Sequence, residues 1–275
     1  QLDPDAGAAR RTSPTNIAMY LLSCVAAREM GFLGEGEMRG RMEQTLDTLE
    51  KMEKWHGHIY NWYATDSLAP LKPRYVSAVD SGNLAAGLLA CAGAVEGPLA
   101  ERMEKMARAM DFTRLYDTRR KLFHIGEDVE KGRLSASYYD LLASESRILV
   151  FTAMRMGQIP PESWRKMGRP TSGGALLSWS GTMFEYLMPD LFMRSMPHTL
   201  LGETPRKVVR AQMQYGAARK RPWGVSESGY CAFDMHLNYQ YRAFGMREMS
   251  MGGVVSREVV APYAGCLALQ VFPRQ

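Results

Sequence analysis

The chain has 275 residues, of which 46% are hydrophobic and 23% charged, a balance typical of a globular protein with one large domain or two small ones. The formal net charge is +5, but acidic residues are interspersed with the lysines and arginines, so no basic face or tail indicates nucleic-acid binding. No run of about 18 apolar residues is present, and we therefore expect no transmembrane segment in this chain.

The four cysteines are isolated from one another, at Cys24, Cys91, Cys231 and Cys266. They form no CxxC pair, and the histidines do not lie at metal-ligand spacing, so we expect no metal and no cofactor. Scattered single cysteines are typical of buried thiols in a reducing compartment.

Helical patterns dominate the first half of the chain. Ser13 followed by Pro14 predicts a helix start, because proline is tolerated in the first turn, and Gly31 is placed to end that helix. Apolar residues at helical spacing predict further helices through residues 38–52, from Asp80 or Ser81 as a cap through residue 89, and through residues 99–110. Most of the 20 methionines fall on these stripes and are interpreted as core residues.

The rest of the chain alternates helices with other structure. Residues 57–80 are rich in aromatics and proline, and residues 121–125 predict a short strand. Helices are predicted over residues 138–156, near 162, and over 183–196, 204–218 and 258–269, with a long aromatic loop from Trp223 to about Phe244. Successive helices with short and long connections favour an all-α toroid of helical hairpins. No linker rich in proline, glycine or serine divides it, so we expect a single domain over residues 1–275.

Two carboxylates in nearly apolar segments are the strongest catalytic candidates. On a helix from residue 138, Glu145 would share the buried face with Leu142 and Leu149. A carboxylate there is costly unless it is paired, hydrogen-bonded or protonated. Either it has a chemical role, or it forms a structural ion pair with Arg147 or Arg169.

Glu227 lies in PWGVSESGY, between Gly224 and Gly229, with Trp223 and Tyr230 beside it. Loops often carry functional residues, and aromatic side chains offer flat apolar faces for pyranose rings. The alternative is a solvent-exposed loop acid. Together the two carboxylates suggest acid/base or nucleophilic chemistry on a sugar.

Other residues in similar surroundings are candidates for contact with a substrate. Helix capping is an alternative role for Asp80 and Asp140, and a buried ion pair is an alternative for Glu185. The candidate substrate-binding residues are Trp62, Arg74, Tyr75, Asp80, Tyr139, Asp140, Trp179, Glu185, Trp223, Tyr230, Tyr239, Gln240 and Tyr241.

Several sequence blocks occur in an order that is familiar from one protein family. They are RTSPTNIAMYLLS, GHIYNWY, PRYVSAVDSGNLA, SYYDLLASESR, LLSWSGTMFEYLMP, PWGVSESGY, and YQYRAFG with APYA. Over essentially the whole chain they resemble the glycoamylase-like domain of cyclic β-1,2-glucan synthases, which is related to endo-β-1,2-glucanases.

This resemblance implies a fold, a substrate and a setting. The fold would be an (α/α)6 toroid, here incomplete at both ends because about nine or ten helices are recognisable instead of twelve. The GRPTSGGALLSW segment is also shorter than the usual family loop. The substrate would be β-1,2-glucan polysaccharide. The domain would lie in the cytoplasm, as part of an inner-membrane-bound synthase with neighbouring domains in the same polypeptide.

The resemblance also places the family's two catalytic carboxylates on Glu145 and Glu227. Ring closure by transglycosylation would retain the anomeric configuration, with Glu227 as nucleophile and Glu145 as acid/base. We prefer this order of roles because burial on an apolar helix face would raise the pKa of Glu145. The alternatives are an endo-β-1,2-glucanase, with an inverting mechanism as one form, and a non-catalytic glucan-binding or scaffold module.

Overall fold

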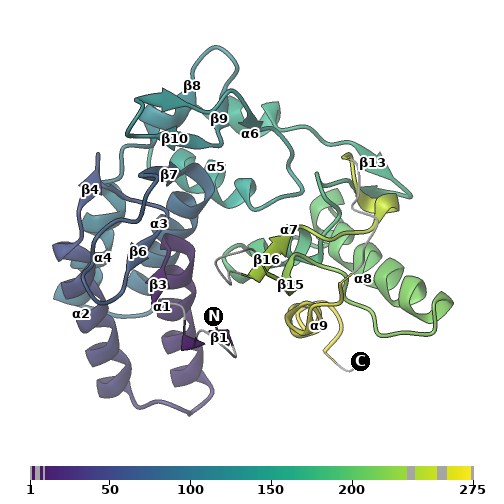
Figure 1. Ribbon diagram of the computed structural model, residues 1–275, viewed down its shortest axis with the longest axis horizontal. Helices are drawn as coiled ribbons and strands as arrows, with labels where there is room; N and C mark the ends of the chain where they lie inside the picture. The colour runs from purple at the N-terminus through teal and green to yellow at the C-terminus, as the bar shows by residue number, and fades with distance from the viewer. Residues whose placement is uncertain (1, 4–6, 9, 234–238, 253–258, 274–275) are drawn as a thin grey trace. The chain divides into compact units, whose positions relative to one another are not determined.

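The structure is a computed structural model that describes residues 2–3, 7–8, 10–233, 239–252 and 259–273 (Figure 1). The chain divides into two compact units. The N-terminal unit contains Arg10–Asp140 and Ile148–Lys166, and the C-terminal unit contains Gln1–Ala9, Leu141–Arg147 and Met167–Gln275. The expectation of a single domain over residues 1–275 stays a prediction.

Four long helices form the core of the N-terminal unit, and helix α3 packs against both α1 and α4, while α2 packs against α1 and α4 (Figure 1). Methionine and leucine side chains at the predicted spacing, such as Met38, Met42 and Met103, are fully buried between them. The helices are α1 (Pro14–Glu29), α2 (Glu35–Lys51), α3 (Ala78–Ala92) and α4 (Pro98–Arg108).

The helix start at Ser13 and Pro14 is confirmed, because the Ser13 hydroxyl accepts the N–H of Asn16 at 3.3 Å and Pro14 is the first helical residue. The predicted cap of α3 was wrong. Ser77 caps this helix, and its hydroxyl accepts the N–H of Asp80, which lies in the first turn. A strand that ends at Ser77 fixes the extended backbone that a cap residue needs.

Short antiparallel strands fill the predicted non-helical segments of this unit. The strand expected at residues 121–125 is confirmed as β9. The strands and short helices are β3 (Arg11–Thr12), β4 (Lys54–Trp55), β5 (His58–Ile59), β6 (Tyr63–Ala64), β7 (Tyr75–Ser77), η1 (Phe112–Leu115), β8 (Tyr116–Asp117), β9 (Leu122–His124), β10 (Gly126–Asp128), β11 (Arg133–Leu134), β12 (Tyr138–Tyr139) and α6 (Glu162–Lys166).

The helix predicted over residues 138–156 begins later than expected. Tyr138 and Tyr139 form β12, which pairs with β9 in antiparallel register, and helix α5 spans only Ser146–Arg155. Backbone pairing with a strand that ends 14 residues earlier overrides the helical spacing of the apolar residues. Glu145 therefore lies in the turn before α5, half-buried, and not on a buried helix face.

The C-terminal unit is built around helix α8, against which α7 and strand β14 pack. Helix α7 ends earlier than predicted, and α8 begins earlier, after a cap by Thr199. The start predicted at residue 258 lies outside the described residues. The elements are β1 (Leu2–Asp3), β2 (Gly7–Ala8), β13 (Thr171–Ser172), β14 (Ala175–Leu176), α7 (Met183–Leu187), η2 (Met188–Leu191), α8 (Leu200–Ala218), β15 (Ser228–Phe233), β16 (Tyr239–Arg242), η3 (Arg247–Met249) and α9 (Pro262–Ala268).

The segment predicted as a long aromatic loop contains a β-hairpin. Strands β15 and β16 pair in antiparallel register, with Gly229 opposite Tyr241 and Tyr230 opposite Gln240. Within the described ranges, no helix is long and apolar enough to cross a membrane.

A buried ion pair ties the start of α5 to η2. The Arg147 side chain is 2% exposed, and its guanidinium lies 3.0 Å from the carboxylate of Asp190. It also donates to the carbonyl oxygens of Tyr186, at 3.0 Å, and of Glu185, at 3.5 Å. Burial raises the pKa of Asp190, and the Arg147 charge opposes that effect. Arg147 is therefore a structural link between the turn that carries Glu145 and helix α7.

We predict that Arg147→Met lowers the free energy of unfolding by about 3–5 kcal/mol, because it leaves the partly buried Asp190 carboxylate without its counter-charge. Adding Asp190→Asn should then cost much less than it does in the otherwise unchanged chain. A double-mutant cycle by urea unfolding measures both effects. Strictly additive losses would show that the pair is not a coupled unit.

A fully buried histidine lies in the N-terminal unit. The ring of His58 packs edge-on against Phe112, with centroids 5.0 Å apart, and near Trp55. Burial lowers the pKa of His58 from 6.5 to about 4, and the neighbouring Asp111 only partly opposes this. His58 is therefore neutral in the folded protein at all but acidic pH.

This histidine should make stability depend on pH. Between pH of about 6.5 and about 4 the unfolded chain binds a proton that the folded chain does not, so folding stability falls as the pH is lowered through this range. The full loss is about 3 kcal/mol. Urea unfolding at several pH values should show a weaker pH dependence for His58→Leu than for the wild type.

The matched control for this test is His198→Asn, which removes an exposed histidine whose φ of 61° asparagine tolerates. It should keep the wild-type pH dependence. If His58→Leu and the wild type showed the same dependence of stability on pH, His58 would not be the source of that dependence.

Candidate active site around Glu227

Glu227 immediately precedes strand β15, and a buried glutamine fixes the backbone that leads to it. The amide of Gln212 accepts the N–H of Val225 at 2.9 Å and donates to the Val225 carbonyl at 3.0 Å. The preceding residue, Gly224, has φ of 111°, a conformation that favours glycine. Gln212 on α8 therefore positions the loop from which Glu227 projects.

Two hydroxyl groups donate to the carboxylate of Glu227, one to each oxygen. The Thr182 hydroxyl is 3.3 Å from Oε1, and the Tyr241 hydroxyl donates a short hydrogen bond to Oε2. Thr182 is fully buried at the start of α7, and Tyr241 comes from β16. Hydrogen bonds donated to a carboxylate favour its charged form.

Thr182 is held in place by a capping box at the start of α7. Its hydroxyl accepts the N–H of Glu185 at 3.1 Å, and the Glu185 carboxylate accepts the N–H of Thr182 at 3.0 Å. The same carboxylate accepts the Ser178 hydroxyl at 2.9 Å. Because the N–H of Glu185 occupies the acceptor side of the Thr182 hydroxyl, its single proton is directed to Glu227.

A third hydroxyl holds the backbone of Glu227. Tyr263, on α9, donates to the carbonyl oxygen of Glu227 at 2.7 Å and lies 2.8 Å from the Ser226 hydroxyl. The Ser226 hydroxyl in turn accepts the N–H of Phe184 at 3.0 Å. These contacts join α7, α9 and the Glu227 loop in one hydrogen-bond network.

The pKa values of the network follow from burial and charge. Burial raises the pKa of Glu227, and the nearby Glu185 carboxylate adds to this, whereas the hydrogen bonds from Tyr241 and Thr182 oppose it. Burial and the charge of Glu227 raise the pKa of Tyr241. Tyr241 is therefore a protonated donor at neutral pH.

Glu145 belongs to the same unit and acts on the same tyrosine. Its negative charge contributes to the raised pKa of Tyr241, which is the donor to Glu227. Arg147, which the sequence offered as a partner for Glu145, pairs with Asp190. The charges of both predicted catalytic carboxylates therefore raise the pKa of Tyr241.

Thr182, Ser226 and Tyr263 are not among the site residues predicted from the sequence. Thr182 had a recognisable signal, because threonine followed three residues later by glutamate is the pattern of a capping box. Ser226 and Tyr263 carried no comparable signal, since the hydrogen bond between them joins residues 37 positions apart.

The other predicted residues of the C-terminal unit lie on the hairpin or near it. Tyr230 packs edge-on against Phe244, with centroids 5.4 Å apart, and Gln240 is its cross-strand neighbour. Trp179 is 45% exposed and Trp223 is half-buried. The side chain of Tyr239 lies outside the described residues.

Six predicted residues belong to the N-terminal unit, and the side chains of three of them make contacts within that unit. Arg74 pairs with Glu53 at 2.9 Å, and Asp80 accepts the Thr15 hydroxyl at 2.5 Å. Trp62 lies under the guanidinium of Arg11, and burial raises the pKa of Tyr75, which lies in β7. The remaining two are Tyr139, in β12, and Asp140, which follows it.

Comparisons with known proteins extend over the whole chain. It is 31% identical to cyclic beta-(1,2)-glucan synthase NdvB of Rhizobium meliloti (strain 1021), over an alignment of 410 positions that takes in all of this chain. The chain spans only 14% of the length of that relative. No family model matches the chain.

Among solved structures, an endo-beta-1,2-glucanase from Chitinophaga pinensis, in complex with sophorotriose and glucose, matches with a TM-score of 0.74 at 14% identity. That match covers 98% of this chain and 71% of the glucanase. A candidate glucoamylase from Bacteroides fragilis matches with a TM-score of 0.71 at 16% identity, covering 98% of this chain and 72% of the other. The chain therefore has a glycoamylase-like fold, and its predicted resemblance to a segment of cyclic β-1,2-glucan synthases is confirmed.

Proposed function

We propose that this chain is a carbohydrate-active domain that acts on β-1,2-glucan by transglycosylation with retention, as part of a larger cyclic glucan synthase. The observation that carries the proposal is the Glu227 carboxylate, which accepts hydrogen bonds from two hydroxyl groups. The surrounding sequence is related over the whole of this chain to a cyclic glucan synthase. The helices would then form part of an (α/α)6 toroid. The adjoining domains and a location on the cytoplasmic side of the inner membrane belong to the same proposal.

In the first step, the ionised carboxylate of Glu227 would attack the anomeric carbon of a glucose unit. The bond from that carbon to the glycosidic oxygen breaks, and the carboxylic acid of Glu145 gives its proton to the leaving oxygen. The products of this step are a covalent glycosyl ester on Glu227 and a shortened glucan with a free hydroxyl.

In the second step, the Glu145 carboxylate would take the proton of an acceptor hydroxyl, and the oxygen of that hydroxyl attacks the anomeric carbon. The ester bond to Glu227 breaks and its carboxylate is restored. When the acceptor is the far end of the same glucan, the product is a ring, and when it is water, the product is a shorter linear chain.

The local geometry supports Glu227 as the nucleophile. A nucleophilic carboxylate must be ionised, and the donors Thr182 and Tyr241 both stabilise the charged form. The earlier reason for assigning the acid role to Glu145, a buried helix face, no longer applies, because Glu145 lies in a turn. The charge of Glu145 is near enough to contribute to the raised pKa of Tyr241, the donor to Glu227, and this nearness supports a role for Glu145 in the same site.

Hydrolysis of β-1,2-glucan is the second candidate function. The observation in its favour is the fold likeness to an endo-beta-1,2-glucanase. The two functions use the same carboxylates and differ in the acceptor, so the products separate them. A cyclic product has the mass of a linear chain of the same length less one water.

We predict that Glu227→Gln lowers the rate of product formation from linear β-1,2-glucan by at least about 10³-fold, because an amide cannot serve as the nucleophile. The measurement is mass spectrometry of the products after incubation of equal amounts of folded variant and wild type. The matched control is Glu248→Gln, which removes an exposed carboxylate of the same unit and should keep wild-type activity. If Glu227→Gln formed product at the same rate as the wild type, Glu227 would not be the nucleophile.

We also predict that the rate depends on pH through Glu227. Since attack needs the ionised form, activity is lost as the pH falls through the pKa of Glu227, which lies above the usual 4.5. Tyr241→Phe removes a hydrogen bond to the charged form and raises that pKa further. The acidic limb of kcat/KM against pH should move upward by about one pH unit.

The control for this profile is Tyr230→Phe, on the same hairpin, which should leave the acidic limb in place. If Glu227 were the acid/base instead, Tyr241→Phe would move the basic limb, because activity would then require the protonated carboxyl. Movement of the basic limb alone would therefore reverse the two roles.

A further inference from the structure

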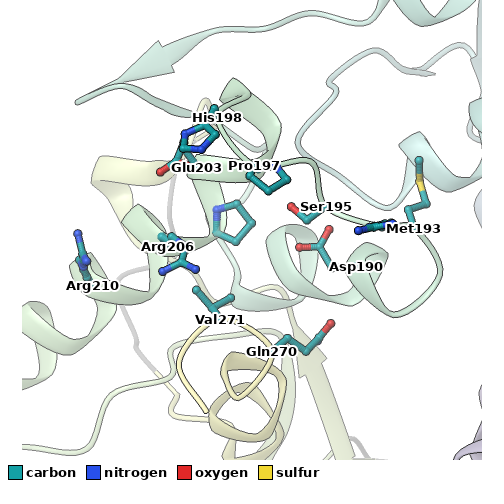
Figure 2. A pocket seen from close by; sticks show the side chains of 13 residues that line it. Asp190, Met193, Ser195, Pro197, His198, Glu203, Arg206, Arg210, Gln270 and Val271 are labelled. Atoms are coloured by element: carbon teal, nitrogen blue, oxygen red, sulfur yellow. The ribbon is translucent and has the colours of Figure 1, made fainter. Parts of the chain in front are cut away.

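A cavity of about 610 Å³ lies in the C-terminal unit, and its lining includes neither Glu145 nor Glu227 (Figure 2). It is formed by Asp190 and the residues after η2, by the first turns of α8, and by Gln270 and Val271 after α9. Its volume is within the usual range of sites for small molecules. The lining is mostly polar and charged, which indicates a polar ligand.

The charges around this cavity do not balance. Arg194, Arg206 and Arg210 line it on the positive side, and Asp190 and Glu203 on the negative side. Asp190 is neutralised by Arg147, at 3.0 Å. For the three lining arginines, no ion pair with a carboxylate is found within the described part of the chain. The lining residues that the structure describes therefore carry a net charge of about +2 at neutral pH.

Two of these arginines lie close together on one helix. Arg206 and Arg210 lie four residues apart on α8, and their guanidinium groups lie 5.8 and 5.5 Å from the ring centroid of Phe272. Like charges at this spacing repel each other. Figure 2 shows Arg206 between Glu203 and Val271, with Arg210 farther along the helix at the edge of the cavity. A bound anion would relieve the repulsion.

We propose that this cavity binds a small organic phosphate monoester. A phosphate monoester carries close to two negative charges at neutral pH, which matches the excess positive charge. Planar guanidinium groups bind phosphate oxygens with two parallel hydrogen bonds. The cavity is larger than a phosphate group alone, and Ser195, His198 and Gln270 offer hydrogen bonds to the organic part.

The test is isothermal titration calorimetry of the whole chain at low ionic strength and pH 7.5, in the absence of glucan. Glucose 6-phosphate should bind at one site, inorganic phosphate should bind more weakly, and glucose should give no signal. Arg206→Gln combined with Arg210→Gln should weaken the binding of glucose 6-phosphate at least tenfold. Glu203→Gln, which removes a negative charge from the lining, should strengthen it severalfold.

The matched control is Lys51→Gln combined with Lys105→Gln, which changes the net charge equally at exposed positions of α2 and α4 and should bind as the wild type does. Equal affinities of the arginine double variant and the wild type would overturn the proposal. So would the absence of saturable binding to the wild type, or equally tight binding of glucuronate, which would show that a carboxylate serves as well as a phosphate. These readouts need no glucan, so their failure would leave the proposed glucan chemistry unaffected.

Discussion

A partly buried carboxylate must be stabilised by its surroundings, and at Glu227 this is achieved by hydroxyl groups from two separate elements. Thr182 illustrates how tightly the arrangement is determined. Its hydroxyl has one proton, and because it accepts the N–H of Glu185, that proton is available to Glu227. The hydroxyl group that caps α7 therefore also orients the carboxylate of the candidate nucleophile. Tyr241 supplies the second donor from β16.

The surrounding structure maintains this feature through backbone contacts. Gln212 fixes the approach to Glu227, and Arg147 binds the carbonyls at the end of α7. The segment before Thr182 lies directly against the segment after β16. A Cβ on Gly181 would lie 2.4 Å from the Met246 carbonyl oxygen, and one on Gly245 would lie 1.9 Å from the Ser180 carbonyl oxygen. Only glycine allows so close an approach at these two positions. The proposed retaining mechanism needs a nucleophile of fixed position, and these contacts restrict the position of Glu227.

Local signals in the sequence predicted the parts of the fold that local interactions determine. The serine and proline before α1 and the methionine stripe of α2 are examples, because capping and helical spacing act within a few residues. The predictions were wrong where pairing between distant residues decides the structure. Tyr138 pairs with His124 in a sheet, and the aromatic segment after Glu227 folds into a hairpin. The choice of Glu145 and Glu227 came from their apolar surroundings and from family resemblance, whereas Thr182, Ser226 and Tyr263 reach the site only through the folded chain.

The stereochemistry of the bond that is formed tests the central claim most directly. Proton NMR spectroscopy of the earliest product from linear β-1,2-glucan reports the configuration at the anomeric carbon. An account in which Glu227 forms a covalent glycosyl ester predicts the β configuration, because two displacements restore the original arrangement. A first product with the α configuration would show a single displacement by an activated acceptor, and would contradict the role assigned to Glu227.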